Sequence, residues 1–174
     1  MKDDGDTKLY LKEANMEDVK MEYEFITNTP EDENGFTNPG FGCSREEFED
    51  RILPGYINAA MGVGLPEGWV QETVLFLWAE DKVVGLFRIR HYLTESLVNG
   101  AGHIGYGIRK EFRGKGYASV GLKLAIEKAW RIIKENEIYM SVHKDNPASL
   151  RVQIKNGAYI HHEDEREFYT RIRR

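Results

Sequence analysis

The stretch Arg113-Gly114-Lys115-Gly116-Tyr117-Ala118 separates a run typical of a strand, 103–109, from a long helical pattern. Its two glycines allow positive φ and let backbone N–H groups approach a ligand closely. Two cations and the first turn of a helix at the same point favour an anion. The stretch therefore predicts a pyrophosphate site. An ordinary strand-to-helix turn with solvated cations is the alternative.

The residues on either side of this stretch predict regular elements. From Tyr117 to about Asn136, apolar residues recur at helical spacing on one side, and charged residues occupy the other. Before the stretch, three strand-like runs follow one another with polar connections, which predicts an antiparallel meander. These runs are 73–79, 83–92 and 103–109.

The rest of the chain adds strands and helices to this meander. Caps and breakers mark the helices: Asn15, the Ser44/Glu47 capping-box spacing, Pro54 and the pair Asn146-Pro147. We expect strands at 8–12, 138–143, 159–162 and 168–172, helices at 16–27, from 45 and after 146, and loops at 29–42 and 62–68. The order predicts a mixed sheet with helices packed on it.

Length and composition limit the class of protein. The 174 residues fit one domain, 1–174, and a net charge of −5 argues against nucleic acid or a membrane surface as partner. The acidic start MKDDGDTK does not resemble a signal peptide, and Cys43 has no second cysteine to pair with. We expect a cytoplasmic protein with no metal site. The sequence leaves the oligomeric state open, a homodimer included.

Two common nucleotide motifs fit the stretch poorly. A Walker A loop needs Ser or Thr after its Gly-Lys, whereas Gly116 follows Lys115 here. A dinucleotide-binding fingerprint needs a third glycine or an alanine where Ser119 stands. Both of these nucleotide-binding motifs are therefore disfavoured.

The chain resembles the GCN5-related N-acetyltransferases, the GNAT family, in two motifs. Arg113, Gly116 and Ala118 match the family's pattern of Arg or Gln, two residues, Gly, one residue, then Gly or Ala, at the junction of its fourth strand and the next helix. Asn146, Ser149 and Gly157 match an Asn after the fifth strand, a small residue three positions later and a helix-ending Gly. The resemblance covers about 73–172, and the first third only weakly.

This resemblance implies a fold, a co-substrate and a site. The fold is α+β in three layers, α/β/α, with a mixed, mostly antiparallel central sheet of about seven strands flanked by helices. The co-substrate is acetyl-CoA, whose pantetheine arm pairs with backbone at the end of the fourth strand. The implied cofactor-binding residues are Ile108, Arg109, Arg113, Gly114, Lys115, Gly116, Tyr117, Ala118, Asn146 and Ser149. A ladder bond to another strand at 108–109, and an ordinary N-cap at Asn146, are the alternatives.

The catalytic positions of the family are not reproduced in this chain. Where many members have a Tyr seven residues after the Asn, this chain has Gln153, and where some have a Glu on the fifth strand it has Ser141. His103, near the start of the fourth strand, is our candidate base, although a lone histidine there is often structural. Tyr159 and Tyr106 are weaker candidates for the acid.

The sequence also suggests where an acceptor binds. The loops 31–42 and 62–71 carry acids and aromatics, Trp69 among them, that suit a cationic amine, although solvated loop acids explain most of them as well. Arg88, Arg90 and His91 suggest instead a carboxylate on an amino-acid-like acceptor. Strand alternation puts Arg88 and Arg90 on one face and His91 on the other.

The sequence predicts an N-acetyltransferase that moves an acetyl group from acetyl-CoA to a primary amine of a small molecule. In this family the amine attacks the thioester directly, so the protein positions the reactants. A peptide or protein amine is the second choice. The missing Tyr and Glu also allow a regulatory module that binds acyl-CoA without catalysis, and a protein-interaction module in which the loop only turns the chain is a third alternative.

Overall fold

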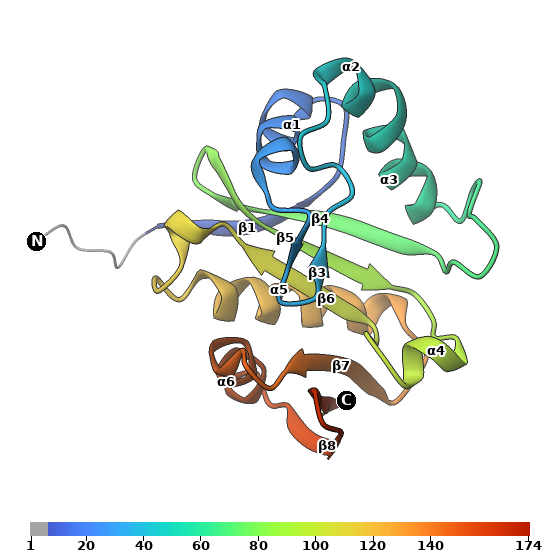
Figure 1. Ribbon diagram of the computed structural model, residues 1–174, viewed down its shortest axis with the longest axis vertical. Helices are drawn as coiled ribbons and strands as arrows, with labels where there is room; N and C mark the ends of the chain where they lie inside the picture. Colours follow the sequence, from blue (N-terminus) through green and yellow to red (C-terminus); the bar gives the residue numbers. More distant parts are fainter. Residues whose placement is uncertain (1–6) are drawn as a thin grey trace, which may run out of the picture.

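The computed structural model describes residues 7–174, so part of the acidic start, residues 1–6, lies outside the described residues. The long strands form two antiparallel sheets (Figure 1). The first has the order β1-β4-β5-β6, and the second the order β7-β9-β8. Their bounds are β1 (Leu9–Glu13), β4 (Glu72–Ala79), β5 (Lys82–Arg90), β6 (Ile104–Ile108), β7 (Glu137–His143), β8 (Tyr159–Glu163) and β9 (Glu167–Arg173).

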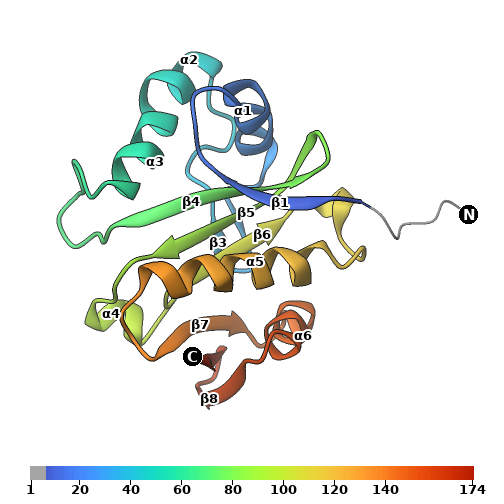
Figure 2. The same ribbon diagram turned by 180° about the vertical axis from the view of Figure 1, so that it is seen from behind.

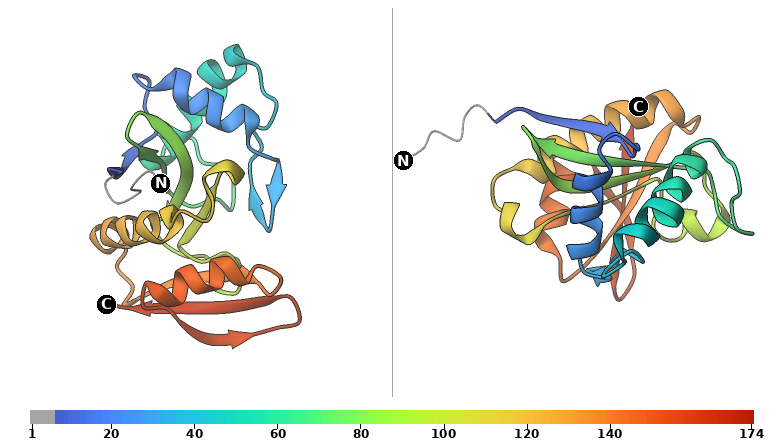
Figure 3. Two further views of the ribbon diagram at one scale, coloured as in Figure 1. Left: turned by 90° about the vertical axis from the view of Figure 1, so that its left-hand side faces the viewer. Right: turned by 90° about the horizontal axis from the view of Figure 1, so that it is seen from above.

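Helices lie on both faces of the first sheet (Figure 2). One face is covered by α1 (Val19–Asn28), α2 (Arg45–Glu47), a π-helical turn at Phe48–Ile52 and α3 (Leu53–Ala60). The other face is covered by α5 (Tyr117–Ile132), below which the second sheet and α6 (Pro147–Lys155) form a further layer (Figure 3). Two short helices, α4 (Glu95–Val98) and a 3₁₀ turn at Lys110–Phe112, lie in connections. None of the helices described in residues 7–174 is long and apolar enough to cross a membrane.

Strand β4 is apolar from its third residue, Val74, to its end at Ala79, which suits a strand with both faces covered. Leu75 and Leu77 pack into the core beneath α5, whereas Val74 and Phe76 pack into the core beneath α1 and α3. Successive side chains of a strand point to opposite faces, so a strand between two cores needs apolar residues at both parities. The continuous apolar run at 73–79 reflects this position.

The α+β fold with a mostly antiparallel sheet flanked by helices is confirmed, with one difference in how the strands are grouped. The seven long strands do not form one continuous sheet. The two sheets meet at an isolated bridge between Gly102 and Met140, where the His103 amide donates to the Tyr139 carbonyl at 2.6 Å. Beyond that point β6 has no ladder partner on its second edge among the described strands.

A small hairpin lies in the segment predicted as a loop at 29–42. Strands β2 (Asp32–Glu33) and β3 (Phe36–Thr37) pair across Asn34 and Gly35, which have φ values of 54° and 80°. Positive φ at both central residues is typical of a type I′ turn, and Asn-Gly is the preferred sequence for it. The signal is therefore present in the sequence, but its strands are too short to show a pattern.

The helix boundaries differ from the predicted ones by a few residues. The side chain of Asn15 accepts hydrogen bonds from the amides of Glu17 and Asp18, which makes a turn before α1 begins at Val19. Ser44 caps α2 as predicted, since its hydroxyl accepts from the Glu47 amide at 3.1 Å. Pro54 lies in the first turn of α3, directly after the π-helical turn, so the hydrogen-bond pattern changes there while the backbone stays helical.

Glu22 predicts a pH dependence of stability. The carboxyl is fully buried on α1 and accepts a hydrogen bond from the Asn15 amide at 3.1 Å. Burial raises the pKa of Glu22 from 4.5 to about 8. Between these values the folded protein holds a proton that the unfolded chain has lost, so the free energy of unfolding decreases as the pH rises through this range. The contribution is fully present at low pH and lost above about pH 8.

Glu22→Gln should therefore stabilise the protein more at pH 9 than at pH 5, because Gln cannot ionise. Each kcal/mol regained raises Tm by roughly 2–4 °C, so thermal unfolding of wild type and variant at the two pH values measures the effect. Glu24→Gln, at an exposed position of the same helix, is the matched control. An equal Tm difference at both pH values would contradict the assignment.

Candidate active site

Two cavities meet at the second edge of β6. A large cleft of about 790 Å³ extends from the start of α5 along this edge to α6, and a small pocket of about 260 Å³ continues beyond it. The residues that line both cavities come from the hairpin, from β6 and from the start of α6. They are Glu33, Asn34, Phe36, Tyr106, Asn146 and Ser149.

The hydrogen-bond pattern of β6 gives this edge its chemistry. The Arg109 amide donates to the Val84 carbonyl, and the Arg90 amide donates to the His103 carbonyl, both across to β5. Because the ladder alternates, the backbone groups of Ile104, Tyr106 and Ile108 point to the other edge, toward the cavities. An extended peptide-like ligand can pair with such an edge.

Of the two residues predicted to pair with the pantetheine arm, one faces β5 and the other faces the cleft. The Arg109 amide is used by the ladder to β5, which was the alternative reading of this position. The Ile108 carbonyl faces the cleft and accepts a hydrogen bond from Arg113 Nε at 2.8 Å. The backbone of Tyr106, which the sequence did not single out for this purpose, lies on the same edge as that of Ile108.

The glycine loop has the geometry of an anion site. Gly114 and Gly116 have φ values of 77° and 80°, and no atom lies within 4 Å of where a Cβ would stand. The amides of residues 114–118 donate to no acceptor within residues 7–174. Those of Tyr117 and Ala118 belong to the first turn of α5, where an N–H has no partner within the helix. Gly114, Gly116, Tyr117 and Ala118 line the large cleft. Unpaired amides at a helix start are the groups that hold a pyrophosphate.

The two cations of the loop lie differently. Arg113 lines the cleft and forms a bidentate ion pair with Glu33 of the hairpin, with N–O distances of 2.8 and 2.7 Å. This pair lowers the pKa of Glu33 and joins the hairpin to the loop. Lys115 does not line the cleft, and its ammonium lies 5.9 Å from the centre of the Phe112 ring.

Tyr106, Ser149 and Asn146 meet at the junction of the two cavities. The Tyr106 hydroxyl lies 2.8 Å from Ser149 Oγ, and its ring stacks on Phe87. Burial raises the pKa of Tyr106, so its hydroxyl keeps its proton. Asn146 caps α6, since its Oδ1 accepts from the Ser149 amide at 3.2 Å. Asn146 thus has the capping role and also lines both cavities.

Gln153 and Ser141, which stand at the two positions where the resemblance would place a catalytic Tyr or Glu, lie beside this junction. Gln153 is buried, its Oε1 accepts from the Thr170 hydroxyl at 2.7 Å, and it lines the small pocket together with Ser141. Neither side chain is an acid or a base in water. The titratable hydroxyl at this point comes from β6, as Tyr106, instead of from α6.

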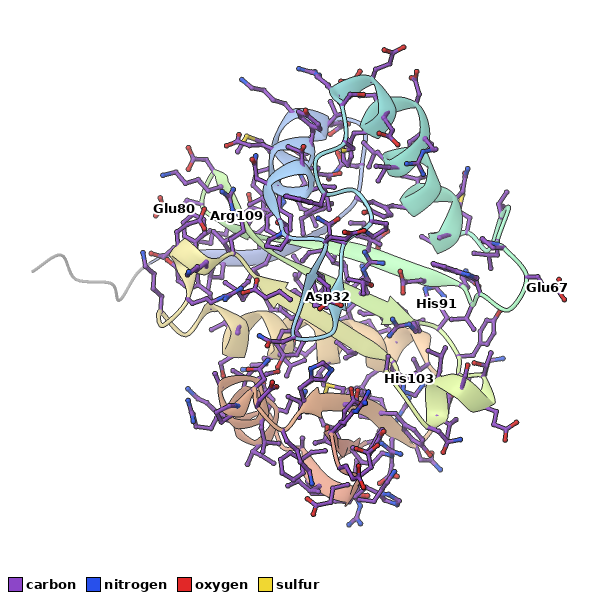
Figure 4. All side chains as sticks on the ribbon, in the orientation of Figure 1. Asp32, Glu67, Glu80, His91, His103 and Arg109 are labelled. Atoms are coloured by element: carbon purple, nitrogen blue, oxygen red, sulfur yellow. The ribbon has the colours of Figure 1, made fainter. Side chains whose placement is uncertain are left out.

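His103 lies outside both cavities. The side chain is 0% exposed, Nδ1 accepts from the Tyr139 amide at 3.0 Å, and Nε2 lies 3.5 Å from Glu135. Burial lowers the pKa of His103, which favours the neutral imidazole. Figure 4 shows His103 and His91 toward the α4 end of the sheet and Arg109 toward the other end. The contacts of His103 hold the two sheets together where they meet, and its position gives a catalytic role no support.

Arg88 and Arg90 line the small pocket and share one carboxylate. Glu72, on the neighbouring strand, lies 3.4 Å from the nearest nitrogen of each. Arg90 also donates to the Gly102 carbonyl at 3.1 Å, and Arg88 to the Thr37 carbonyl at 3.4 Å. The structure therefore brings together two of the four predicted acceptor-binding residues.

The other two lie elsewhere. Trp69 is 64% exposed and lines neither cavity, and Figure 4 shows Glu67, from the same loop, at the outer edge of the molecule. His91 points to the opposite face from Arg88 and Arg90, as alternation predicts, and its Nε2 lies 2.7 Å from the Thr73 hydroxyl. Tyr159 donates to Glu137 at 2.6 Å and lines neither cavity.

Sequence reasoning missed a pair on the second sheet. His143, at the end of β7, lines the small pocket with Glu167 of β9, and its Nε2 lies 3.2 Å from the Glu167 carboxylate. The tip of the hairpin lies against this imidazole at Gly35, where a Cβ would come within 2.7 Å of Nε2. The position of His143 at the end of the strand before Asn146 was a signal for this placement.

Comparisons with known proteins agree with this arrangement. A family model described as a GNAT acetyltransferase domain matches residues 8–159. Among solved structures, the chain is similar to a probable acetyltransferase, with 17% identity, a TM-score of 0.71, and coverage of 98% of this chain and 95% of that one. It is also similar to RimL, a ribosomal alpha-N-protein acetyltransferase in complex with coenzyme A, with 19% identity, a TM-score of 0.69, and coverage of 95% and 93%.

A third similar structure is the N-acetyltransferase PseH of Campylobacter jejuni in complex with acetyl coenzyme A, with 13% identity, a TM-score of 0.60, and coverage of 96% and 99%. The comparison with curated proteins gives no match. The fold and the family model together define the class of the protein, an acetyltransferase. Within that class, the chain belongs to the GNAT family.

Proposed function

We propose that this protein is an N-acetyltransferase that moves the acetyl group of acetyl-CoA to a primary amine of a small molecule. The observation that carries the proposal is the meeting of the two cavities at Tyr106, Asn146 and Ser149. A donor and an acceptor that enter from opposite sides come into contact there. Direct attack of the amine on the thioester needs such a junction, because most of the catalysis is correct positioning.

The large cleft fits acetyl-CoA. The unpaired amides of residues 114–118 would hold the pyrophosphate, with the positive end of α5 behind them. The backbone edge at Ile108 and Tyr106 would pair with the amides of the pantetheine arm. Bound in this direction, acetyl-CoA would present its thioester at the junction with the small pocket.

The small pocket supports a small acceptor. Its volume of about 260 Å³ lies below the usual range for drug-sized ligands, which begins at about 300 Å³. An amine bound there would approach the thioester past Tyr106.

The single cysteine, Cys43, supports a reducing compartment such as the cytoplasm for this activity.

Two side chains at the site would move protons. The Tyr106 hydroxyl, protonated because burial raises its pKa, would donate to the leaving sulfur. His143, which lines the small pocket, would take the proton that the attacking amine gives up, with Glu167 orienting its ring. Both assignments place the acid and the base on strands.

An assay of thiol release from acetyl-CoA with a panel of primary amines tests the proposal. We expect amine-dependent release of free CoA and formation of the N-acetyl product by mass spectrometry. In the same assay, His143→Gln should lower kcat about 10²-fold, in the usual range for general acid–base catalysis. Unchanged kcat would remove His143 as the base.

Three outcomes would contradict parts of the proposal. Acetyl-CoA binding without turnover across the panel would favour a regulatory module that binds acyl-CoA. Turnover confined to peptide amines would make the acceptor a peptide or protein. No calorimetric signal with acetyl-CoA at high micromolar concentration would favour an interaction module and remove the co-substrate.

A further inference from the structure

Arg88 and Arg90 lie at one end of the small pocket, on one face of β5. The two side chains are two positions apart on the strand and lie beside the same acid, Glu72. Glu72 stands opposite Arg90 in the antiparallel register and Val74 stands opposite Arg88. The arrangement is therefore fixed by strand pairing, and it forms part of the pocket wall.

The side chain of Arg88 makes only long, weak hydrogen bonds. Its two bonds, to Glu72 and to the Thr37 carbonyl, are both 3.4 Å long, and its Nε has no partner among the described residues. The usual N–H···O distance is about 2.7–3.2 Å. The side chain is nonetheless only 12% exposed, and its guanidinium lies 5.8 Å from the centre of the Phe36 ring. Arg88 is thus held in place, and its terminal nitrogens, whose two bonds are long, are the donors that a ligand carboxylate could use.

The charges at the arginine end of the pocket do not balance. Glu72 neutralises one of the two arginines, which leaves one positive charge there. Neither acid that lines the pocket pairs with these arginines: Glu33 pairs with Arg113, and Glu167 lies beside His143 on the second sheet. A partly buried charge without a counterion is costly, so a single negative charge on the ligand would stabilise the complex.

The position of the arginines relative to Tyr106 sets the direction of the acceptor. Arg88 stands opposite Gly105 in the register, next to Tyr106. Gly105 has no atom within 4 Å of where a Cβ would stand, so this part of the wall is clear. A short molecule with its anion at Arg88 and Arg90 could extend past Gly105 and present its amine at the junction.

We propose that Arg88 and Arg90 bind a carboxylate of the acceptor, so that the substrate of this site is an amino acid or a similarly small amino-carboxylate. This inference rests on the proposed function for its amine end. The carboxylate end is argued independently, from the fork geometry of arginine and the single unbalanced charge. An amino-carboxylate differs from the purely cationic amine that the acids of the loops 31–42 and 62–71 suggested.

The test compares matched pairs of acceptors. Small α- and ω-amino acids are each assayed beside their own carboxamides, which keep the amine and remove the charge. We expect KM to be about 10-fold lower or more for at least one acid than for its amide, because charge-assisted bonds are lost. 2-Aminoethyl phosphate extends the panel, and a preference for it over every acid would overturn the assignment of a singly charged carboxylate.

Variants locate the effect. Arg88→Met should abolish the difference in KM between the acid and its amide, so the ratio of the two KM values is the readout. Arg88→Lys should retain part of the preference, since it keeps the charge and loses the fork. Arg51→Met, on the π-helical turn and outside both cavities, is the control and should change neither KM. If Arg88→Met does not fold, the wild-type pairs and Arg88→Lys still decide the question.

The proposal can fail separately from the proposed function. Equal KM values for every acid and its amide in an active enzyme would overturn the carboxylate site and leave the acetyltransferase intact. If no acceptor is acetylated, calorimetry of the CoA-loaded protein with N-acetyl amino acids and their amides decides. Binding of the acid that Arg88→Met abolishes would support the site although the proposed reaction fails. No preference for the acid would overturn it.

Discussion

Replacing both Gly114 and Gly116 by valine is expected to weaken the binding of acetyl-CoA about 100-fold or more. Valine disfavours the positive φ of both residues, so the loop would change shape and its amides would no longer converge. Charge-assisted hydrogen bonds contribute about 1.5–3 kcal/mol each, so the loss of two is enough for a 100-fold effect. Calorimetric titration with acetyl-CoA measures it.

The loop between α3 and β4 offers a matched control. Gly64 and Gly68 also have positive φ, 65° and 80°, with no atom within 4 Å of a Cβ, and they line neither cavity. Gly64→Val/Gly68→Val should therefore cost similar stability by thermal unfolding and leave the Kd for acetyl-CoA unchanged. Equal Kd values for the two double variants and wild type would show that the pyrophosphate binds elsewhere.

Tyr106→Phe is expected to lower kcat about 10²-fold while the Kd for acetyl-CoA stays within about twofold. The substitution keeps the ring that stacks on Phe87 and removes the hydroxyl that lies beside Ser149. Because burial raises the pKa of Tyr106, any loss of kcat caused by its ionisation should fall at a higher pH than the ordinary titration of a tyrosine. Stopped assays of kcat and KM across pH measure both effects.

Tyr159→Phe is the matched control for this prediction. Tyr159 was the other candidate acid, but its hydroxyl donates to Glu137 outside both cavities. It should affect stability by the loss of one hydrogen bond, about 1 kcal/mol, and leave kcat unchanged. Full activity of Tyr106→Phe would show that Tyr106 does not protonate the leaving thiolate. The thiolate would then need no proton from the protein, or another group would donate it.

Local sequence was enough to predict the local structure of the elements that we propose bind acetyl-CoA. The glycines that need positive φ, the helix that starts at Tyr117 and the Asn146 cap all depend on residues within a few positions of one another. For this reason the loop, its helix and the following cap could be predicted together. The periodicity of β4 and β5 likewise identified the meander, because burial on both faces produces a continuous apolar run.

The acceptor side depended on contacts between distant residues. Glu33 and Arg113 are 80 positions apart, and Tyr106 and Ser149 are 43 positions apart, so no local pattern could indicate either pair. His103 is the opposite case, a residue that local sequence favoured and long-range packing removed from the site. Its sequence position suggested a base, whereas the folding of β7 against it placed the imidazole in the interior, with Tyr139 and Glu135 as partners.

The sequence by itself determined the conformation of the glycine loop and the order of strands and helices, because backbone conformation and periodicity are set by neighbouring residues. Only the tertiary structure decided which side chains share the site. The divergence of β6 from β7 opens one edge of β6, and the hairpin lies over it. The register of β4 with β5 places Glu72 opposite Arg90, where its carboxylate lies close to both Arg88 and Arg90. Those are packing and pairing events between segments far apart in the chain, and their geometry has no counterpart in local sequence.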